Sequence, residues 1–197
     1  MLQEVSDELH LNAIRCEGEA ALYGPKLDFM FKDALGRDVQ IPTVQLDFAL
    51  PKRFDLNYID EYGKKVHPVM VHRAVLGSYE RFIALILEQF KGVLPVWLSP
   101  VQVNIVPVNM KYHDEYCKKI FNLLNNEDIR VSYDDSKESM GKKLRQSNLM
   151  KNPYTLVIGD NEKDNNIISY RKYNREEMNS LSIDDFIKFI KEEIKNR

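Results

Sequence analysis

The chain has 197 residues, with 28 basic and 30 acidic side chains, so its formal net charge at pH 7 is -2. With 44% hydrophobic and 29% charged residues, the composition is that of a folded globular protein and excludes the disordered and fibrous classes. No stretch approaches the roughly 18 consecutive apolar residues of a membrane span, and the first residues lack the basic and apolar regions of a signal peptide. We therefore expect a cytoplasmic protein with no membrane partner.

The two cysteines, Cys16 and Cys117, lie far apart in different sequence contexts. They predict neither a disulfide framework nor a CxxC metal site, and the simplest expectation is that both are buried or half-buried thiols. Charge is close to balanced in both halves of the chain. The sequence therefore lacks the overall basic character of many nucleic-acid-binding domains, and any contact with RNA would depend on locally placed residues.

The N-terminal half contains helix and strand patterns in succession. Apolar residues three and four apart predict a helix over 2–9, and because no capping residue precedes it, we expect it to continue a helix from upstream. Alternation over 27–31 and an extended run over 39–48 predict an antiparallel hairpin. A strand rich in β-branched residues is predicted at 69–76. The helix that follows, over 77–90, is apolar on most of its circumference and is expected to be buried.

A change of pattern divides the chain. Residues 92–100 contain one glycine and two prolines and form the best domain boundary. Beyond them we predict the order β-α-β-α-β-β-α, ending in a helix capped by Ser182. The predicted domains are residues 1–97 and 98–197. The predicted fold class is α/β, with an α+β segment built on an antiparallel sheet followed by an α/β domain with a mixed sheet.

Arg81 lies in the predicted helix 77–90 among mainly apolar residues. A guanidinium is always charged and costly to bury without a partner. Two interpretations are open. The side chain reaches solvent or pairs with a neighbouring carboxylate, or it stacks on a base or binds a phosphate.

His72 lies in the predicted strand 69–76, flanked by valine and methionine. A single histidine in such a strand is more often a hydrogen-bonded structural residue than a ligand, and no other ligand-type residue stands beside it at metal-binding spacing. His10, His67 and His113 have polar neighbours in the sequence and are expected to be exposed, without a functional role.

Tyr23 and Lys26 bracket a Gly-Pro turn that would fix a phenol and an ammonium in place. Such a lysine either offsets phosphate charge or is only solvated. No GxxxxGK[ST], GxGxxG, GxSxG or HExxH motif occurs, which excludes the common nucleotide-loop, hydrolase and metalloprotease classes at the level of motifs.

Gln40, Thr43 and Gln45 lie on the extended run 39–48. In a regular strand Thr43 and Gln45 point to one face and Gln40 to the other, unless Pro42 introduces a kink or a bulge. Polar side chains facing an interior would suit recognition of a small polar ligand. The same residues could equally form the solvated face of a sheet.

Four segments in this order and spacing resemble threonyl-tRNA synthetases. They are GEAALYGPK (18–26), TVQLDF (43–48), PVMVHRAVLGSYERF (68–82) and PVWLSPVQ (95–102). The segment 72–83 is similar to the third signature motif of class II synthetases, in which a glycine precedes a helix that begins with a Glu-Arg pair. The resemblance covers essentially the whole chain. It implies that residues 1–97 are the C-terminal part of a class II catalytic core and that residues 98–197 are an anticodon-binding domain.

The resemblance implies roles at the catalytic centre. His72 matches one of three protein ligands of a zinc ion that binds the amino and hydroxyl groups of threonine. Arg81 matches the arginine that packs on the adenine of ATP, and Ser78 falls in the same ATP-binding motif. Arg81 and Lys26 are the implied catalytic residues.

Further positions match the family's substrate and RNA contacts. Tyr23 and Gln45 match residues that line the threonine pocket. Lys26, Gln40 and Thr43 match residues near ATP or the adenylate. The implied anticodon contacts are Glu162 and Arg171.

Some positions depart from the family pattern. The other two zinc ligands and the first two class II motifs would lie upstream of Met1, and Cys16 matches neither ligand. Members of the family often read Gln-Cys-Gly-Thr where this chain has the segment 40–43, and Arg-Asn-Glu-Lys where it has the segment 136–139.

The implied activity is ATP-dependent attachment of threonine to tRNA(Thr), with Mg²⁺ neutralising the phosphates of ATP and with homodimers as the family's assembly. Because two zinc ligands and two motifs would lie upstream, the chain by itself is predicted to be inactive, which threonine-dependent pyrophosphate exchange tests. The alternative is a non-catalytic tRNA-binding or regulatory module derived from a synthetase.

Overall fold

The computed structural model describes residues 2–196 and divides the chain into two compact units, unit 1 (Met1–Gln89) and unit 2 (Phe90–Arg197). The glycine- and proline-rich segment 92–100 belongs to unit 2. Arg130 holds it there, because its guanidinium donates to the carbonyl oxygens of Trp97 and Ser99 at 2.7 and 2.8 Å. No helix within residues 2–196 is long and apolar enough to span a bilayer.

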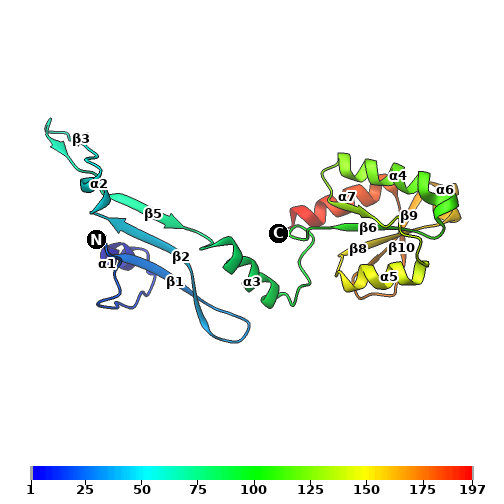
Figure 1. The fold of residues 1–197 in the computed structure, drawn as a ribbon, viewed down its shortest axis with the longest axis horizontal. Coiled ribbons are helices and arrows are strands. Elements are labelled where there is room, and N and C mark those ends of the chain that lie inside the picture. The colour runs from blue at the N-terminus through cyan, green and yellow to red at the C-terminus, as the bar shows by residue number, and fades with distance from the viewer. Residues whose placement is uncertain (1, 197) are drawn as a thin grey trace. The chain divides into compact units, whose positions relative to one another are not determined.

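Unit 1 is built on a three-stranded antiparallel sheet in the order β1-β2-β5 (Figure 1). A separate two-stranded hairpin, β3-β4, lies between β2 and β5 in the chain. The elements of unit 1 are α1 (Leu2–Glu8), β1 (Lys26–Lys32), β2 (Asp38–Asp47), α2 (Leu50–Arg53), β3 (Tyr58–Ile59), β4 (Lys65–Val66), β5 (Met70–Ala74) and α3 (Tyr79–Gln89). The predicted first helix, hairpin and third strand are therefore confirmed.

A bulge in β2 changes which side chains share a face. Asp28 of β1 pairs with Thr43, but Met30 pairs with Gln40, so two residues of β2, at positions 41 and 42, oppose one residue of β1. The extra residue falls beside Pro42, which has no N–H to give to the ladder. The bulge that the sequence analysis allowed for at Pro42 therefore occurs.

Unit 2 is a five-stranded mixed sheet in the order β10-β9-β8-β6-β7. The central β6 is parallel to β7 and β8, whereas β9 and β10 run antiparallel. Its elements are β6 (Val103–Pro107), α4 (Met110–Asn126), β7 (Val131–Tyr133), α5 (Met140–Leu149), β8 (Tyr154–Ile158), α6 (Asp160–Asn165), β9 (Ile167–Lys172), β10 (Asn179–Ser182) and α7 (Ile183–Lys195). The predicted α/β class with a mixed sheet is confirmed. The short α6 and β10 are additional.

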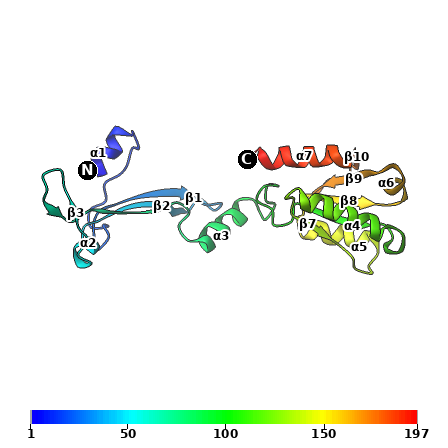
Figure 2. The same cartoon turned by 90° about the horizontal axis from the view of Figure 1, so that it is seen from above.

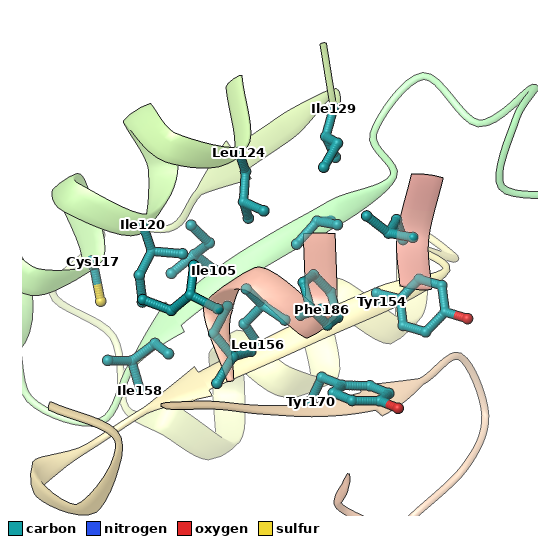
Figure 3. Packing of buried hydrophobic residues seen from close by; sticks show 14 of the residues in the cluster. Ile105, Cys117, Ile120, Leu124, Ile129, Tyr154, Leu156, Ile158, Tyr170 and Phe186 are labelled. Carbon is teal, nitrogen blue, oxygen red and sulfur yellow. The ribbon is translucent and has the colours of Figure 1, made fainter. Parts of the chain in front are cut away.

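One face of this sheet carries the hydrophobic core of unit 2. Alternate residues of β6, β8 and β9 pack against α4 and α7, with Leu156 and Phe186 near the centre (Figure 3). Helix α7 lies along β9 and β10 (Figure 2). Ser182 caps this helix as predicted, because its hydroxyl accepts the backbone N–H of Asp185 at 3.1 Å.

The other face of the sheet is polar and is covered by α5. The Ser147 hydroxyl of this helix lies 2.7 Å from that of Thr155, and Asn104 accepts a hydrogen bond from Ser132 at 2.6 Å. The Lys143 ammonium is buried and donates to the carbonyl oxygen of Asp134 at 2.7 Å. This face therefore offers hydrogen-bonding groups rather than apolar surface.

Three burial predictions are wrong. Helix α3 has no buried residue, because within unit 1 no other element packs extensively against it. Cys16 is exposed, since it lies in the irregular segment before β1, whereas Cys117 is buried as expected. His113 is buried: its Nδ1 accepts the N–H of Asn109 at 3.1 Å and its Nε2 lies 3.0 Å from an Asp160 oxygen, so its polar neighbours are its partners.

Candidate functional site

The sheet of unit 1 gathers polar side chains on one of its faces. Directly opposed residues of antiparallel strands share a face. The register pairs Lys26 with Gln45, Asp28 with Thr43, and Gln45 with His72. These five side chains, contributed by three strands, therefore line one continuous surface.

Tyr23 joins this surface because a close backbone approach fixes it beside β2. Its carbonyl oxygen accepts the N–H of Phe48, and the carbonyl oxygen of Pro25 accepts that of Leu46, both at 3.0 Å. Only glycine fits at position 24, since a Cβ there would lie 2.0 Å from the Leu46 carbonyl oxygen.

Tyr23, Gln45 and His72 form the first cluster of the site. The Tyr23 hydroxyl donates to the Gln45 side-chain oxygen, and the Tyr23 ring meets the His72 ring edge-on with centroids 5.5 Å apart. Tyr23 and Gln45, which the resemblance assigns to the same pocket, are in direct contact. Phenol, amide and imidazole together provide hydrogen-bonding groups for a small polar ligand.

Asp47 fixes the orientation of His72. The His72 Nε2 lies 2.8 Å from Asp47 Oδ2, and Asp47 Oδ1 accepts the backbone N–H groups of Ala49 and Leu50 at 2.9 Å each. Burial opposes ionisation of Asp47, but the hydrogen bonds from His72, Leu50 and Ala49 outweigh it and hold the pKa of this carboxyl below its ordinary value. His72 therefore keeps Nδ1 available for a second contact.

Lys26, Gln40 and Thr43 form the second cluster, and all three contact Asp28. The Lys26 ammonium is ion-paired with the Asp28 carboxylate. Gln40 donates to Asp28 at 2.7 Å and Thr43 at 2.8 Å. The bulge beside Pro42 brings the Gln40 side chain to the same face of the sheet as that of Thr43, rather than to the opposite face.

Arg81 lies at the start of α3 and reaches the neighbouring strand. It is exposed; its backbone N–H donates to the Ser78 hydroxyl at 3.3 Å and its guanidinium to the carbonyl oxygen of Gln40 at 3.5 Å. Among residues 2–196 no carboxylate forms an ion pair with it. Arg81 therefore keeps most of its donors for a ligand beside the second cluster.

Glu162 and Arg171 lie in unit 2, on α6 and β9. Glu162 accepts the N–H of Gly159 at 2.8 Å, which satisfies a backbone donor at the start of α6, and it accepts the hydroxyl of Ser169 at 2.7 Å. Burial opposes its ionisation, but these hydrogen bonds lower its pKa. The Arg171 guanidinium donates to the carbonyl oxygen of Leu144 at 3.4 Å, so it lies on the sheet face that α5 covers.

Two residues of the site are absent from the sequence-based assignment, Asp28 and Asp47. Each had a detectable signal. Asp28 stands two residues after Lys26, the spacing at which side chains of a strand share a face, and Asp47 lies within the segment 43–48 that carries the family resemblance. The sequence-based assignment leaves both out because Gln40 and Thr43 reach Asp28, and His72 reaches Asp47, from other strands.

No cluster of three His, Cys, Asp or Glu side chains suited to a metal ion occurs among the described residues. His72 with Asp47 nevertheless has the arrangement of a metal-binding histidine, whose second ring nitrogen is held by a carboxylate. The residues present therefore fit one ligand of a metal site.

Comparisons with known proteins match both units to known families. Residues 3–90 match the tRNA synthetase class II core domain (G, H, P, S and T), and residues 102–193 match the anticodon binding domain family. The chain is 45% identical over 197 residues to a threonine–tRNA ligase of Oceanobacillus iheyensis, covering 100% of this chain and 30% of the relative. It is 48% identical over 196 residues to the threonine–tRNA ligase of Lactobacillus acidophilus, with coverages of 100% and 30%.

A solved structure is also similar: the RNA binding domain of threonyl-tRNA synthetase from Cryptosporidium parvum Iowa II. It has a TM-score of 0.83 and 38% sequence identity, and the match covers 97% of this chain and 48% of that one. The chain spans 30% of the length of the curated relatives just described. Family models over both units and these identities over nearly its whole length show that the chain belongs to the threonyl-tRNA synthetase family, with a class II core segment followed by an anticodon-binding domain.

Proposed function

We propose that this chain serves the ATP-dependent attachment of threonine to tRNA(Thr), unit 1 by contacting threonine and ATP and unit 2 by contacting the anticodon. The observation that carries the proposal is the common face of β1, β2 and β5. It places the Tyr23–Gln45–His72 cluster directly beside the Lys26–Gln40–Thr43 cluster, since Lys26 opposes Gln45 in the register. Two adjacent polar clusters suit an amino acid and a phosphate group that must react with each other.

The reaction has two steps. The threonine carboxylate attacks the α-phosphorus of ATP, forming threonyl adenylate as the bond to the pyrophosphate oxygen breaks. A terminal ribose hydroxyl of the tRNA then attacks the acyl carbon, and AMP leaves. Both steps gain most from fixed positions and charge stabilisation, the two contributions that hydrogen-bonded side chains on a rigid sheet provide.

Each side chain has a proposed part. Tyr23 and Gln45 hydrogen-bond the threonine. Lys26 lies near the α-phosphate, where its ammonium offsets negative charge that develops during attack. Arg81 stacks on the adenine from the start of α3, with its donors largely unused in the free chain.

The family uses ATP with Mg²⁺, and for zinc we propose His72 as one ligand through Nδ1. When bound, zinc supplies open coordination positions that chelate the amino and hydroxyl groups of threonine. Asp47 holds the His72 ring in the orientation that this contact requires.

Binding of a non-hydrolysable threonyl-adenylate analogue tests the unit 1 assignment. We expect the 197-residue chain to bind it in calorimetry, and Gln45→Ala to weaken binding about tenfold, because a hydrogen bond to the ligand is lost. Gln3→Ala on the exposed face of α1 is the matched control and should bind as the wild type does. Equal affinities for Gln45→Ala and Gln3→Ala would refute the assignment.

A second candidate is a tRNA-binding module that acts without catalysis. It is favoured by unit 2 itself, which has its own hydrophobic core and a polar sheet face. Filter binding of tRNA(Thr) and of the same tRNA with a changed anticodon distinguishes sequence reading from general attraction. Arg171→Gln should reduce the preference, since arginine suits guanine edges and phosphates, whereas Lys188→Gln on α7 should not. If the wild type bound both tRNAs equally well, unit 2 would not read the anticodon, either as part of a synthetase or as a separate tRNA-binding module.

A further inference from the structure

Asp28 is the centre of the second cluster, although the sequence-based assignment of site residues does not include it. One carboxylate oxygen faces the Lys26 ammonium, and the other accepts hydrogen bonds from Gln40 at 2.7 Å and Thr43 at 2.8 Å. Three side chains from two strands therefore meet on a single group. None of these three side chains is hydrogen-bonded to another of the three, so the carboxylate is their common link.

The strand geometry explains how they converge. Lys26 and Asp28 are two residues apart on β1 and share a face, and Thr43 is the direct cross-strand partner of Asp28. Gln40 joins them because of the bulge beside Pro42. A regular β2 would direct Gln40 to the opposite face, so the bulge and the carboxylate together build the cluster.

The ion pair is shielded, since the side chains of Lys26 and Asp28 are only 22% and 20% exposed. The hydrogen bond that Lys26 donates to Asp28 is the main cause that raises the pKa of Lys26 above its ordinary value. Burial opposes this shift, and the charges of Asp28, Glu19 and Cys16 add to it. Lys26 thus stays charged, but its long flexible chain is fixed in one direction. A lysine without such a partner would lose rotamer freedom only when its ligand binds.

We propose that Asp28 is a positioning residue that holds Lys26, Gln40 and Thr43 as one preorganised unit toward the phosphate of ATP or of the adenylate. The inference rests on the proposed function for its ligand and on the observed hydrogen bonds for its geometry. Asp28 itself carries the same sign of charge as the phosphate, so it acts through its three donors rather than by touching the ligand.

The hairpin offers a matched control. Lys32 and Asp38 form a second cross-strand Lys–Asp pair on the same two strands, at 2.7 Å, but both are more than half exposed and neither contacts Gln40 or Thr43. Asp28→Asn and Asp38→Asn remove the same charge from the same hairpin. Any difference between the two variants therefore reflects the position of the carboxylate rather than the change in net charge.

The first measurement is made on the free 197-residue chain by NMR. In the wild type, Lys26 should titrate above the ordinary lysine value, and in Asp28→Asn its midpoint should fall, because the carboxamide presents no charge. The Gln40 amide and Thr43 methyl signals should shift in Asp28→Asn. They should stay in place in Asp38→Asn and in Lys26→Met, which keeps the carboxylate. Wild-type titration of Lys26 at the ordinary value, or unchanged Gln40 and Thr43 signals in Asp28→Asn, would overturn the proposal.

The second measurement is the affinity for ATP with Mg²⁺. We expect Asp28→Asn to weaken binding at least about tenfold, since misplaced groups lose most of their benefit, and Asp38→Asn to leave it unchanged. Equal affinities would overturn the role of Asp28 toward the ligand. If the wild type binds no ATP while the NMR results hold, the proposed phosphate contact fails and Asp28 remains confirmed as the organiser of the cluster.

Discussion

Different kinds of interaction stabilise the interior of unit 1 and the interior of unit 2. Unit 2 contains a continuous cluster of fifteen buried apolar side chains between its sheet and helices α4 and α7. Among the described residues of unit 1, only two apolar side chains are buried, those of Leu46 and Pro51. Unit 1 contains instead backbone ladders and buried or shielded carboxylates, Asp47 and Asp28, that accept hydrogen bonds from neighbouring strands and loops. Apolar truncations should therefore damage unit 2 most, and polar substitutions unit 1.

The largest expected effect is in the core of unit 2. Phe186 is fully buried and contacts the rings of Tyr154 and Tyr170. Phe186→Ala should lower the free energy of unfolding of unit 2 by about 3–5 kcal/mol, because it removes buried surface and leaves a cavity. Urea unfolding followed by circular dichroism measures this. Phe31→Ala on the half-exposed end of β1 is the control, and an equal loss there would contradict the contrast between the units.

Thiol chemistry provides a second comparison. Cys16 in unit 1 is exposed, whereas Cys117 in unit 2 is buried, and burial raises the pKa of its thiol to about 12. Because the thiolate is the reactive form, Cys117 should react with a disulfide reagent at pH 8 at least about a hundredfold more slowly than Cys16. Cys16→Ser and Cys117→Ser assign the two phases. Rapid reaction of Cys117 without denaturant would mean that the core of unit 2 opens readily.

The fold was largely predictable where local pattern and burial agree. Helix α7 has a cap at Ser182 and a single apolar stripe, and both features reappear in the structure. The predicted burial of α3 failed because an apolar circumference says only that a helix can be buried, not which element covers it. Helix α6 was missed because six polar residues carry no apolar period; Glu162 and Gly159 define it through hydrogen bonds.

The site was predictable by residue type but not by arrangement. Family resemblance named Lys26, Gln40 and Thr43, and all three meet in space. What joins them is Asp28, whose importance depends on the bulge in β2 and on a cross-strand register. Neither is encoded in the spacing of residues along one strand.

Acid should weaken unit 1 through Asp47. The pKa of this carboxyl is lower in the folded chain than in the unfolded one, so its stabilisation is complete above the ordinary carboxyl pKa, about 4, and disappears as pH falls through the lower folded value. Urea unfolding measured from about pH 5 to about pH 2, the range in which carboxyl groups titrate, tests this expectation. Asp47→Asn should be less stable than the wild type at pH 7, with a smaller difference at low pH. A constant difference across this range would refute the assignment.

The smallest expected effect concerns the start of α7. The Ser182 hydroxyl accepts the N–H of Asp185 at 3.1 Å and donates to its carboxylate at 2.7 Å, so Ser182→Ala leaves an N–H of the first turn without its cap. The expected loss is about 1 kcal/mol of unfolding free energy in unit 2. Lys188→Ala is the control, because its ion pair with Asp185 is exposed and should contribute nothing measurable. Since α7 covers the apolar face of the sheet, a loss as large as that of Phe186→Ala would mean that the cap, rather than the packing of the stripe, decides whether this helix forms.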